Sequence, residues 1–101
     1  AARAVRGEDF PEGAEQSLIT DFAYGGELTV APGQPILFNN VDAVPHTVSA
    51  GSYEDPSFDL FDSGLLDPGS NFTLTLDEPG TYGLFCTLHA DMNATVTVTG
   101  E

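Results

Sequence analysis

The residues with the greatest potential for chemistry lie close together near the C-terminal end of the chain. Cys86, His89 and Met92 fall within the seven-residue stretch CTLHADM, and the only other histidine is His46. The chain of 101 residues has no further Cys, His or Met. A thiolate and two imidazoles with a weak axial thioether are the ligands of trigonal copper sites, whereas structural zinc usually takes four Cys or His ligands. These residues therefore predict a site for one copper ion.

The spacing of these residues requires two separate segments to meet. Cys86 ends a predicted strand, so His89 and Met92 can converge with it from one tight loop, while His46 must come from another strand. Pro45 stiffens the approach to His46. A rigid sandwich holds the ligand loops in a geometry that is not strongly distorted for either oxidation state of copper. This favours fast electron transfer.

Short runs with strand character supply the elements that must position these ligands. Turn residues separate the runs, and no helix of ordinary length fits. In residues 71–76 (NFTLTL) apolar side chains alternate with threonines, and in residues 81–86 (TYGLFC) Tyr82, Leu84 and Cys86 share one face, which we assign to the core. About eight strands predict an all-β fold, a Greek-key β-sandwich or barrel. The other runs are residues 17–24, 27–30, 35–40 and 94–99.

The first sixteen residues differ from the rest of the chain. Residues 1–16 are polar, rich in Gly and Glu, and show neither the helical nor the strand period, so we predict a flexible acidic arm or linker there. Residues 17–101 then form a single domain. No apolar run approaches the roughly 18 residues that would span a bilayer. Because the chain begins with Ala and shows no leader, we expect a processed or trimmed form.

The net charge excludes two classes of partner. Sixteen acidic residues against two arginines give a formal charge of −14, which repels nucleic acid and anionic membrane surfaces. The charge could steer a basic redox partner, or it could be a solubility adaptation spread over the whole surface. We favour the second interpretation, because the acids are scattered from Glu8 to Glu101. The densest group is Glu54, Asp55, Asp59 and Asp62.

Each candidate ligand has a simpler interpretation when it is taken alone. A lone free Cys such as Cys86 is more often a buried small hydrophobe, and an isolated Met92 would be a core residue that fills a gap. His46 would be a turn residue and His89 a surface residue. The combination of residue types and the spacing of Cys86, His89 and Met92 favour the metal site over these interpretations.

Two segments carry a resemblance to a known family. Residues 39–48 (NNVDAVPHTV) and 61–98 (FDSGLLDPGSNFTLTLDEPGTYGLFCTLHADMNATVTV) resemble the copper-binding part of the plastocyanin and azurin superfamily, the cupredoxins. The similarity covers roughly residues 17–100, and the C-x-x-H-x-x-M spacing is most similar to that of amicyanin. The resemblance implies a type 1 (blue) copper site. In it His46 is the upstream imidazole, Cys86 the thiolate, His89 the imidazole nearer solvent and Met92 the axial ligand.

The resemblance also implies roles for neighbouring residues. Asn40 and Thr47 fall where the family uses polar groups to tie the two ligand loops together and tune the thiolate. Leu88 and Ala90 replace prolines that often flank this histidine, and Phe38 stands where Trp is frequent. Asp91 places a carboxylate near the expected docking face, which should lower the reduction potential modestly.

We expect an electron carrier that is not an enzyme and that cycles one copper between Cu(II) and Cu(I). Its partners would be an electron donor and an acceptor protein, docking transiently on residues 42–46 and 86–92 with Leu65 and Leu66 as apolar neighbours. Copper storage or delivery, an enzyme built from fused cupredoxin-like domains, and a metal-free sandwich are the alternatives. We expect a monomer outside the cytosol, in the periplasm, on the cell surface or secreted, with the N-terminal arm as a tether.

Overall fold

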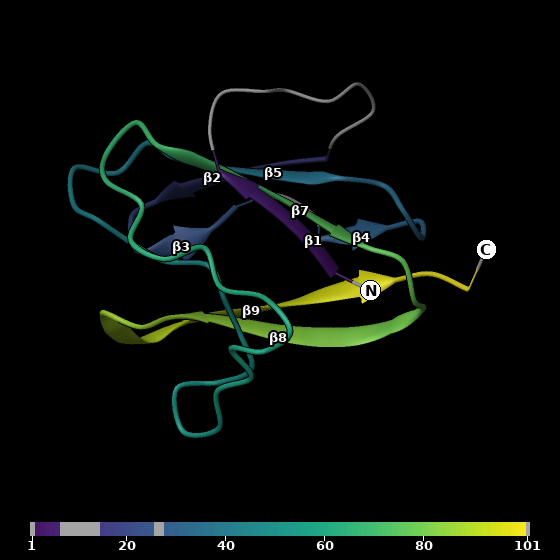
Figure 1. Cartoon of the computed structure of the whole chain (residues 1–101). Coiled ribbons are helices and arrows are strands. Elements are labelled where there is room, and N and C mark those ends of the chain that lie inside the picture. The colour runs from purple at the N-terminus through teal and green to yellow at the C-terminus, as the bar shows by residue number, and fades with distance from the viewer. Residues whose placement is uncertain (1, 7–14, 26–27, 101) are drawn as a thin grey trace.

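Two β-sheets face each other in the structure, a computed structural model that describes residues 2–6, 15–25 and 28–100 (Figure 1). The first sheet holds, in spatial order, β1 (Ala2–Arg6), β7 (Asn71–Leu76), β5 (Ile36–Asn40), β2 (Glu15–Thr20) and β3 (Ala23–Tyr24). The second sheet holds, in spatial order, β4 (Thr29–Val30), β9 (His89–Val98), β8 (Gly80–Cys86) and β6 (Ser49–Ala50).

The predicted all-β sandwich is confirmed. The sequence predicts about eight strands, and the described residues form nine. Apolar side chains from both sheets meet in one buried cluster between the layers, to which Phe38, Phe72, Leu84 and Val96 contribute. None of the described residues forms a helix, and the described part of the chain therefore contains no helix that could cross a membrane.

The period-two patterns place side chains as predicted in the C-terminal half. In β7, Phe72 and Leu74 lie opposite Phe38 and Ile36 of β5, and all four side chains are buried in the core. In β8, Leu84 and Cys86 are fully buried, and Tyr82 packs against the same core. Cys86 therefore ends its strand with its side chain in the core.

The run of residues 17–24 is not one strand, contrary to the sequence prediction. β2 ends at Thr20 and β3 begins at Ala23, and the two strands pair as an antiparallel hairpin. The two residues between them, Asp21 and Phe22, have φ angles of 53° and 60°. Two-residue hairpin turns of this left-handed kind usually contain Gly or Asn, so the sequence carries no local signal for the turn.

The predicted flexible acidic arm or linker over residues 1–16 contains a strand, β1, that the sequence prediction does not include. Strand β1 pairs with β7 in antiparallel register, from Ala2 opposite Leu76 to Arg6 opposite Phe72. The physical reason is that β7 would otherwise be an edge strand with unpaired backbone groups. Glu15 and Gln16 of the predicted arm also pair, with Ile36 and Leu37 of β5, and residues 7–14 lie outside the described residues. A domain boundary near Ser17 stays a prediction.

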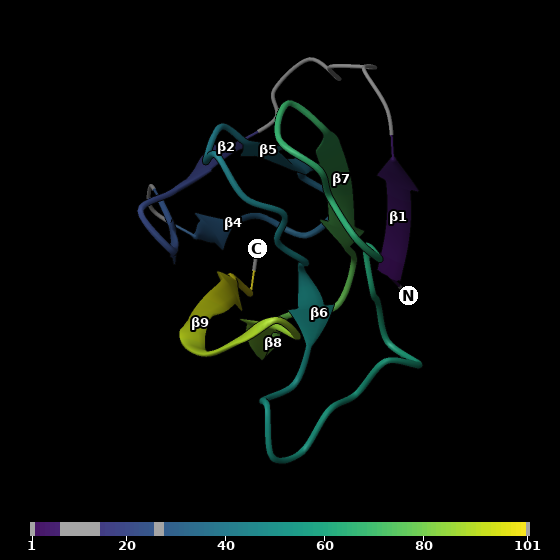
Figure 2. The same cartoon turned by 90° about the vertical axis from the view of Figure 1, so that its left-hand side faces the viewer.

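The long connection between β6 and β7 runs beside the second sheet before it returns to the first (Figure 2). Its first part covers the outer face of β8, where Tyr53 and Phe58 contact the ring of Phe85. Its second part, residues 61–66, pairs with residues 46–50 through backbone hydrogen bonds. The segment that carries His46 is therefore held between β8 and residues 61–66.

Candidate metal centre

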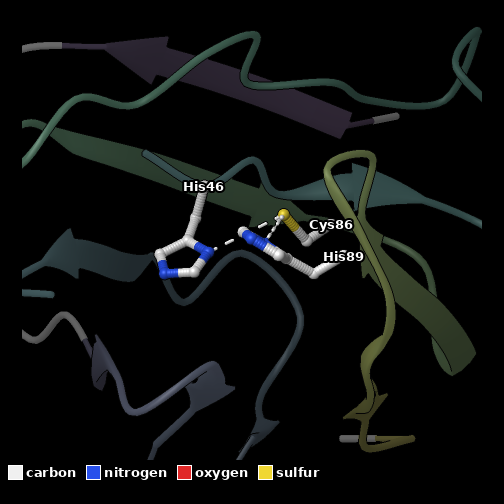
Figure 3. Close-up of side chains that lie close together, drawn as sticks. All are labelled: His46, Cys86 and His89. Carbon is white, nitrogen blue, oxygen red and sulfur yellow. Dashed lines mark hydrogen bonds between the residues drawn. The ribbon is translucent and has the colours of Figure 1, made fainter. Parts of the chain in front are cut away.

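Three candidate ligands from two separate segments of the chain meet at one end of the sandwich. His46 precedes β6, Cys86 ends β8 and His89 begins β9, and their side chains point toward one another (Figure 3). The Sγ atom of Cys86 lies 3.8 Å from Nδ1 of His46 and 3.5 Å from Nδ1 of His89. One nitrogen of each histidine and the sulfur all lie within 4.8 Å of one another.

The segment from Cys86 to Met92 is a tight hairpin and not the single loop that the sequence predicts. β8 and β9 pair directly, with Cys86 opposite His89 and only Thr87 and Leu88 in the turn. The strand register shifts between Phe85 and Cys86. His89 is therefore paired with the end of β8, whereas residues 90–92 lie between the two pairs and form a bulge of β9 that contains Met92.

Backbone pairing fixes the position of His46. The His46 amide donates to the carbonyl of Leu66 at 3.1 Å, and the Leu66 amide donates to the carbonyl of His46 at 2.8 Å. Leu66 is fully buried, so its predicted place on a docking face is wrong, whereas Leu65 is about half exposed. Leu66 anchors a ligand segment because its backbone faces His46 and its side chain enters the core.

A carboxylate determines which nitrogen of His46 faces the cluster. His46 Nε2 lies 2.9 Å from Oδ2 of Asp42, and a carboxylate at neutral pH only accepts hydrogen bonds. The proton of a neutral His46 therefore resides on Nε2, and the lone pair of Nδ1 points toward Cys86. The hydrogen bond from His46, together with one from the Phe22 amide, holds the pKa of Asp42 below its usual range.

Thr47 and Asn40 brace the cluster. The Thr47 amide donates to Cys86 Sγ at 3.4 Å, and its hydroxyl oxygen accepts from the Thr87 amide at 2.9 Å. Thr47 therefore ties the two ligand segments together, as the resemblance implies. Asn40 donates to the carbonyls of Val44 and Leu66, so it stiffens the segment that leads to His46.

Burial divides the candidate ligands into an inner and an outer group. His46 and Cys86 have no exposed surface and Met92 is 3% exposed, whereas the side chain of His89 is partly exposed. Met92 belongs to the same buried cluster as Cys86. The inner group excludes water, and the partly exposed His89 matches its predicted place nearer solvent.

The donor set fits copper better than zinc. Two imidazole nitrogens and one thiol converge, and no disulfide uses Cys86. Only three such donors lie together among the described residues, and the remaining candidate on β9 is the thioether of Met92, which is a weak ligand. Structural zinc would need a fourth strong ligand.

Sequence reasoning missed two residues that contact the cluster. The ring of Phe22 packs edge-on against both imidazoles, with ring centroids 4.5 Å from His89 and 5.3 Å from His46. Asp42 holds His46 as described above. The spacing of Asp42, four residues before His46, offers a weak local signal, whereas nothing near Phe22 in the sequence points to the site.

Comparison with known proteins gives one family. The family model described as copper-binding proteins of the plastocyanin/azurin family matches residues 16–99. Among curated relatives, plastocyanin of Rumex obtusifolius is 35% identical over 82 residues, covering 72% of this chain and 83% of the relative. The chloroplastic plastocyanin minor isoform of Arabidopsis thaliana is 37% identical over 70 residues, covering 62% of this chain. The matched part is 41% of that relative's length.

Solved structures give the same fold. A Cu(I) form of an amicyanin variant superposes with a TM-score of 0.77 at 25% identity, covering 94% of this chain and 97% of the other. A purple cupredoxin of Nitrosopumilus maritimus superposes with a TM-score of 0.71 at 23% identity, covering 84% of this chain and 99% of the other. The second similarity supports the fold alone.

Proposed function

This chain belongs to the plastocyanin/azurin family of copper-binding proteins, and we propose that it carries single electrons between two redox partner proteins. Its cofactor is copper. We assign the ion to Nδ1 of His46, Sγ of Cys86, Nδ1 of His89 and the thioether of Met92. The observation that carries this assignment is the convergence of two imidazole nitrogens on one buried thiol.

Copper, when bound there, supplies a reversible one-electron change between Cu(II) and Cu(I). The protein takes one electron from a reduced partner and gives one to an oxidised partner, and no atom is transferred. His46 and Cys86 are fully buried and held by backbone pairing, so the inner ligands keep their places in both oxidation states. His89 reaches the surface and is the exit for the electron.

The burial of the site argues against the competing functions. Storage or delivery needs a metal that a partner can reach and exchange, but His46 and Cys86 expose no surface. An enzyme would need an open coordination position. Both histidines of the chain already lie in the cluster, so the chain supplies no imidazole for a second site.

We place the docking face around His89. Leu88, next to it in the hairpin turn, is half exposed, and so is Leu65 of the neighbouring segment. Exposed apolar side chains around a partly exposed ligand suit a small and short-lived complex. We expect the protein to act as a monomer outside the cytosol, where copper thiolates persist.

The visible absorption spectrum tests this function. Purified protein that receives one equivalent of Cu(II) should develop an intense thiolate-to-copper charge-transfer band, which a reductant bleaches and an oxidant restores. A Cys86→Ser variant should show no band. A band that bleaches but does not return would favour storage of Cu(I), and a colourless wild-type protein, also after oxidant is added, would overturn the proposal.

A further inference from the structure

The β2–β3 turn holds a bulky aromatic residue in an unusual backbone conformation. Phe22 has a φ of 60°, in the left-handed region that large side chains rarely adopt, and Asp21 before it has a φ of 53°. Conformations of this kind persist only where the surrounding structure determines them, and they are frequent at functional sites. The side chain of Phe22 is 50% exposed, so core packing does not account for its conformation.

One carboxylate oxygen connects this turn to a candidate ligand. The Phe22 amide donates to Oδ2 of Asp42 at 3.2 Å, and Nε2 of His46 donates to the same oxygen at 2.9 Å. The other oxygen of Asp42 accepts from the Ala43 amide at 2.9 Å, which fixes the plane of the carboxylate. The backbone of Phe22 is therefore tied to the imidazole of His46.

The ring of Phe22 contacts both imidazoles at once. Its plane stands at 83° to the ring of His89 and at 86° to that of His46, and the two imidazole centroids are 5.0 Å apart. Edge-to-face contacts of this geometry are attractive. Since His46 is also held by Asp42 and Leu66, the ring has its greatest effect on His89, the more exposed of the two.

We propose that Phe22 is a positioning residue, an aromatic cover held by Asp42 that keeps the His89 imidazole beside Cys86 and slows the loss of the metal. The proposal rests on the proposed function, because it takes His89 as a ligand. In the covered state His89 cannot swing away from Cys86 without losing its contact with the Phe22 ring. The cover thus limits the access of competing chelators to the outer side of the site.

The rate at which a chelator removes copper tests the proposal. In Phe22→Gly the ring is lost while glycine adopts the left-handed backbone without strain, so the fold is kept. Loss of two edge-to-face contacts should accelerate copper removal about tenfold. Phe22→Tyr retains the ring, so the chelator should remove copper from it at the wild-type rate. Leu18→Ala is the matched control, because it removes a half-exposed apolar side chain from the same hairpin.

Equal rates in wild type and Phe22→Gly would overturn the proposal, and so would equal acceleration in Phe22→Gly and Leu18→Ala. If Phe22→Gly does not fold, Phe22→Asn replaces it, since Asn also tolerates the left-handed conformation. A second measurement does not depend on the metal. In the metal-free protein the ring current of Phe22 should shift the imidazole proton signals of His89, and this shift should vanish in Phe22→Gly. If the wild type never forms the charge-transfer band but the shift is present, the proposed function and the role of Phe22 in metal retention both fail, while the positioning of His89 by Phe22 stands.

Discussion

Thr47 is part of a chain of hydrogen bonds whose donors and acceptors can all be assigned. Asp62 only accepts at neutral pH, so the hydroxyl of Ser49, 2.8 Å away, must donate to it. The Ser49 oxygen then accepts from the Thr47 hydroxyl at 3.0 Å, and the Thr47 oxygen accepts from the Thr87 amide. The direction of every bond is determined, from a surface carboxylate to the residue after Cys86.

Replacing Thr47 by Val should separate the two ligand segments. Val has nearly the same shape but offers no oxygen, so the Thr87 amide loses its acceptor, and the free energy of unfolding should fall by roughly 1–3 kcal/mol. Because the position of Cys86 changes with it, the charge-transfer band should also move. Ser49→Ala is the control, since it leaves the bond between Thr47 and Thr87 in place. Denaturant unfolding and absorption spectra check both effects, and a Thr47→Val protein indistinguishable from Ser49→Ala would contradict this account.

Tyr24 gives the folded protein a sensitivity to alkaline pH. Burial, and secondarily the charge of Cys86, raises the pKa of Tyr24 above its usual value, and its hydroxyl donates to the carbonyl of Thr47. The unfolded chain releases this proton near pH 10, whereas the folded protein retains it. The folded state therefore binds more protons, and stability should decrease as the pH rises above about 10.

The test compares wild type with Tyr24→Phe. In denaturant unfolding of the metal-free protein between pH 8 and pH 11, roughly the range that brackets the usual tyrosine pKa, the wild type should lose stability with rising pH more steeply than the variant. Tyr24→Phe should also be less stable at neutral pH, because the Thr47 carbonyl loses its donor. Parallel pH profiles of the two proteins would show that Tyr24 does not cause the alkaline loss.

At the scale of elements, the best-predicted parts are those whose local pattern and tertiary surroundings agree. The alternation in residues 71–76 and 81–86 correctly placed Leu74 and Leu84 in the core, because these strands have one face toward the other sheet. The same patterns placed Cys86 at a strand end. The strand pattern that places Cys86, together with the small number of Cys and His residues in the chain, allowed the three clustered ligand candidates to be predicted.

The elements that were not predicted depend on contacts distant in sequence. β1 exists because β7 offers it a partner about seventy positions away, and residues 2–6 carry no clear period of their own. The turn at Asp21 and Phe22 depends on Asp42 and on both histidines. Neither contact leaves a trace in the local sequence, so hydrophobic periodicity could not find it.

Gly51 should be indispensable to the segment that leaves β6. Its φ is +98°, and a Cβ atom there would lie 2.6 Å from the Asp55 carbonyl oxygen and 2.7 Å from the Ser57 nitrogen. Gly69 is the matched control, because its φ is +90° but no atom lies within 4 Å of the equivalent Cβ position. Gly69→Ala should lower the free energy of unfolding by about 1–2 kcal/mol through its backbone alone. Gly51→Ala should cost roughly 1–3 kcal/mol more, because backbone atoms must also move.

Thermal and denaturant unfolding of the two variants measure this difference. Gly51→Ala should in addition weaken the contacts of Tyr53 and Phe58 with Phe85, which a change in near-ultraviolet circular dichroism would report. Equal destabilisation by the two substitutions would mean that the backbone near Asp55 and Ser57 can move without an energetic penalty. Only the positive φ angle would then determine the loss of stability.

At the scale of the whole molecule, the charge is the dominant property. The two arginines, Arg3 and Arg6, both lie in β1, while the sixteen acidic residues are spread along the chain. The longest dimension of the molecule is 36 Å, comparable to the Debye length of roughly 30 Å at 0.01 M salt. At low salt nearly every carboxylate therefore repels nearly every other, and this repulsion acts against the compact state.

Added salt should accordingly stabilise the protein. As the NaCl concentration rises from about 0.01 M to about 1 M, the Debye length falls to roughly 3 Å and the long-range repulsion disappears, so the melting temperature should rise, most steeply at the low end. A parallel series in tetramethylammonium chloride at equal ionic strength separates screening from specific binding of sodium. The same rise in both salts supports an acidic surface that disfavours the compact state at low ionic strength. A melting temperature that stays constant below about 0.2 M salt would mean that the carboxylates are too far apart or too well hydrated to interact, and the charge would then bear on docking and solubility alone.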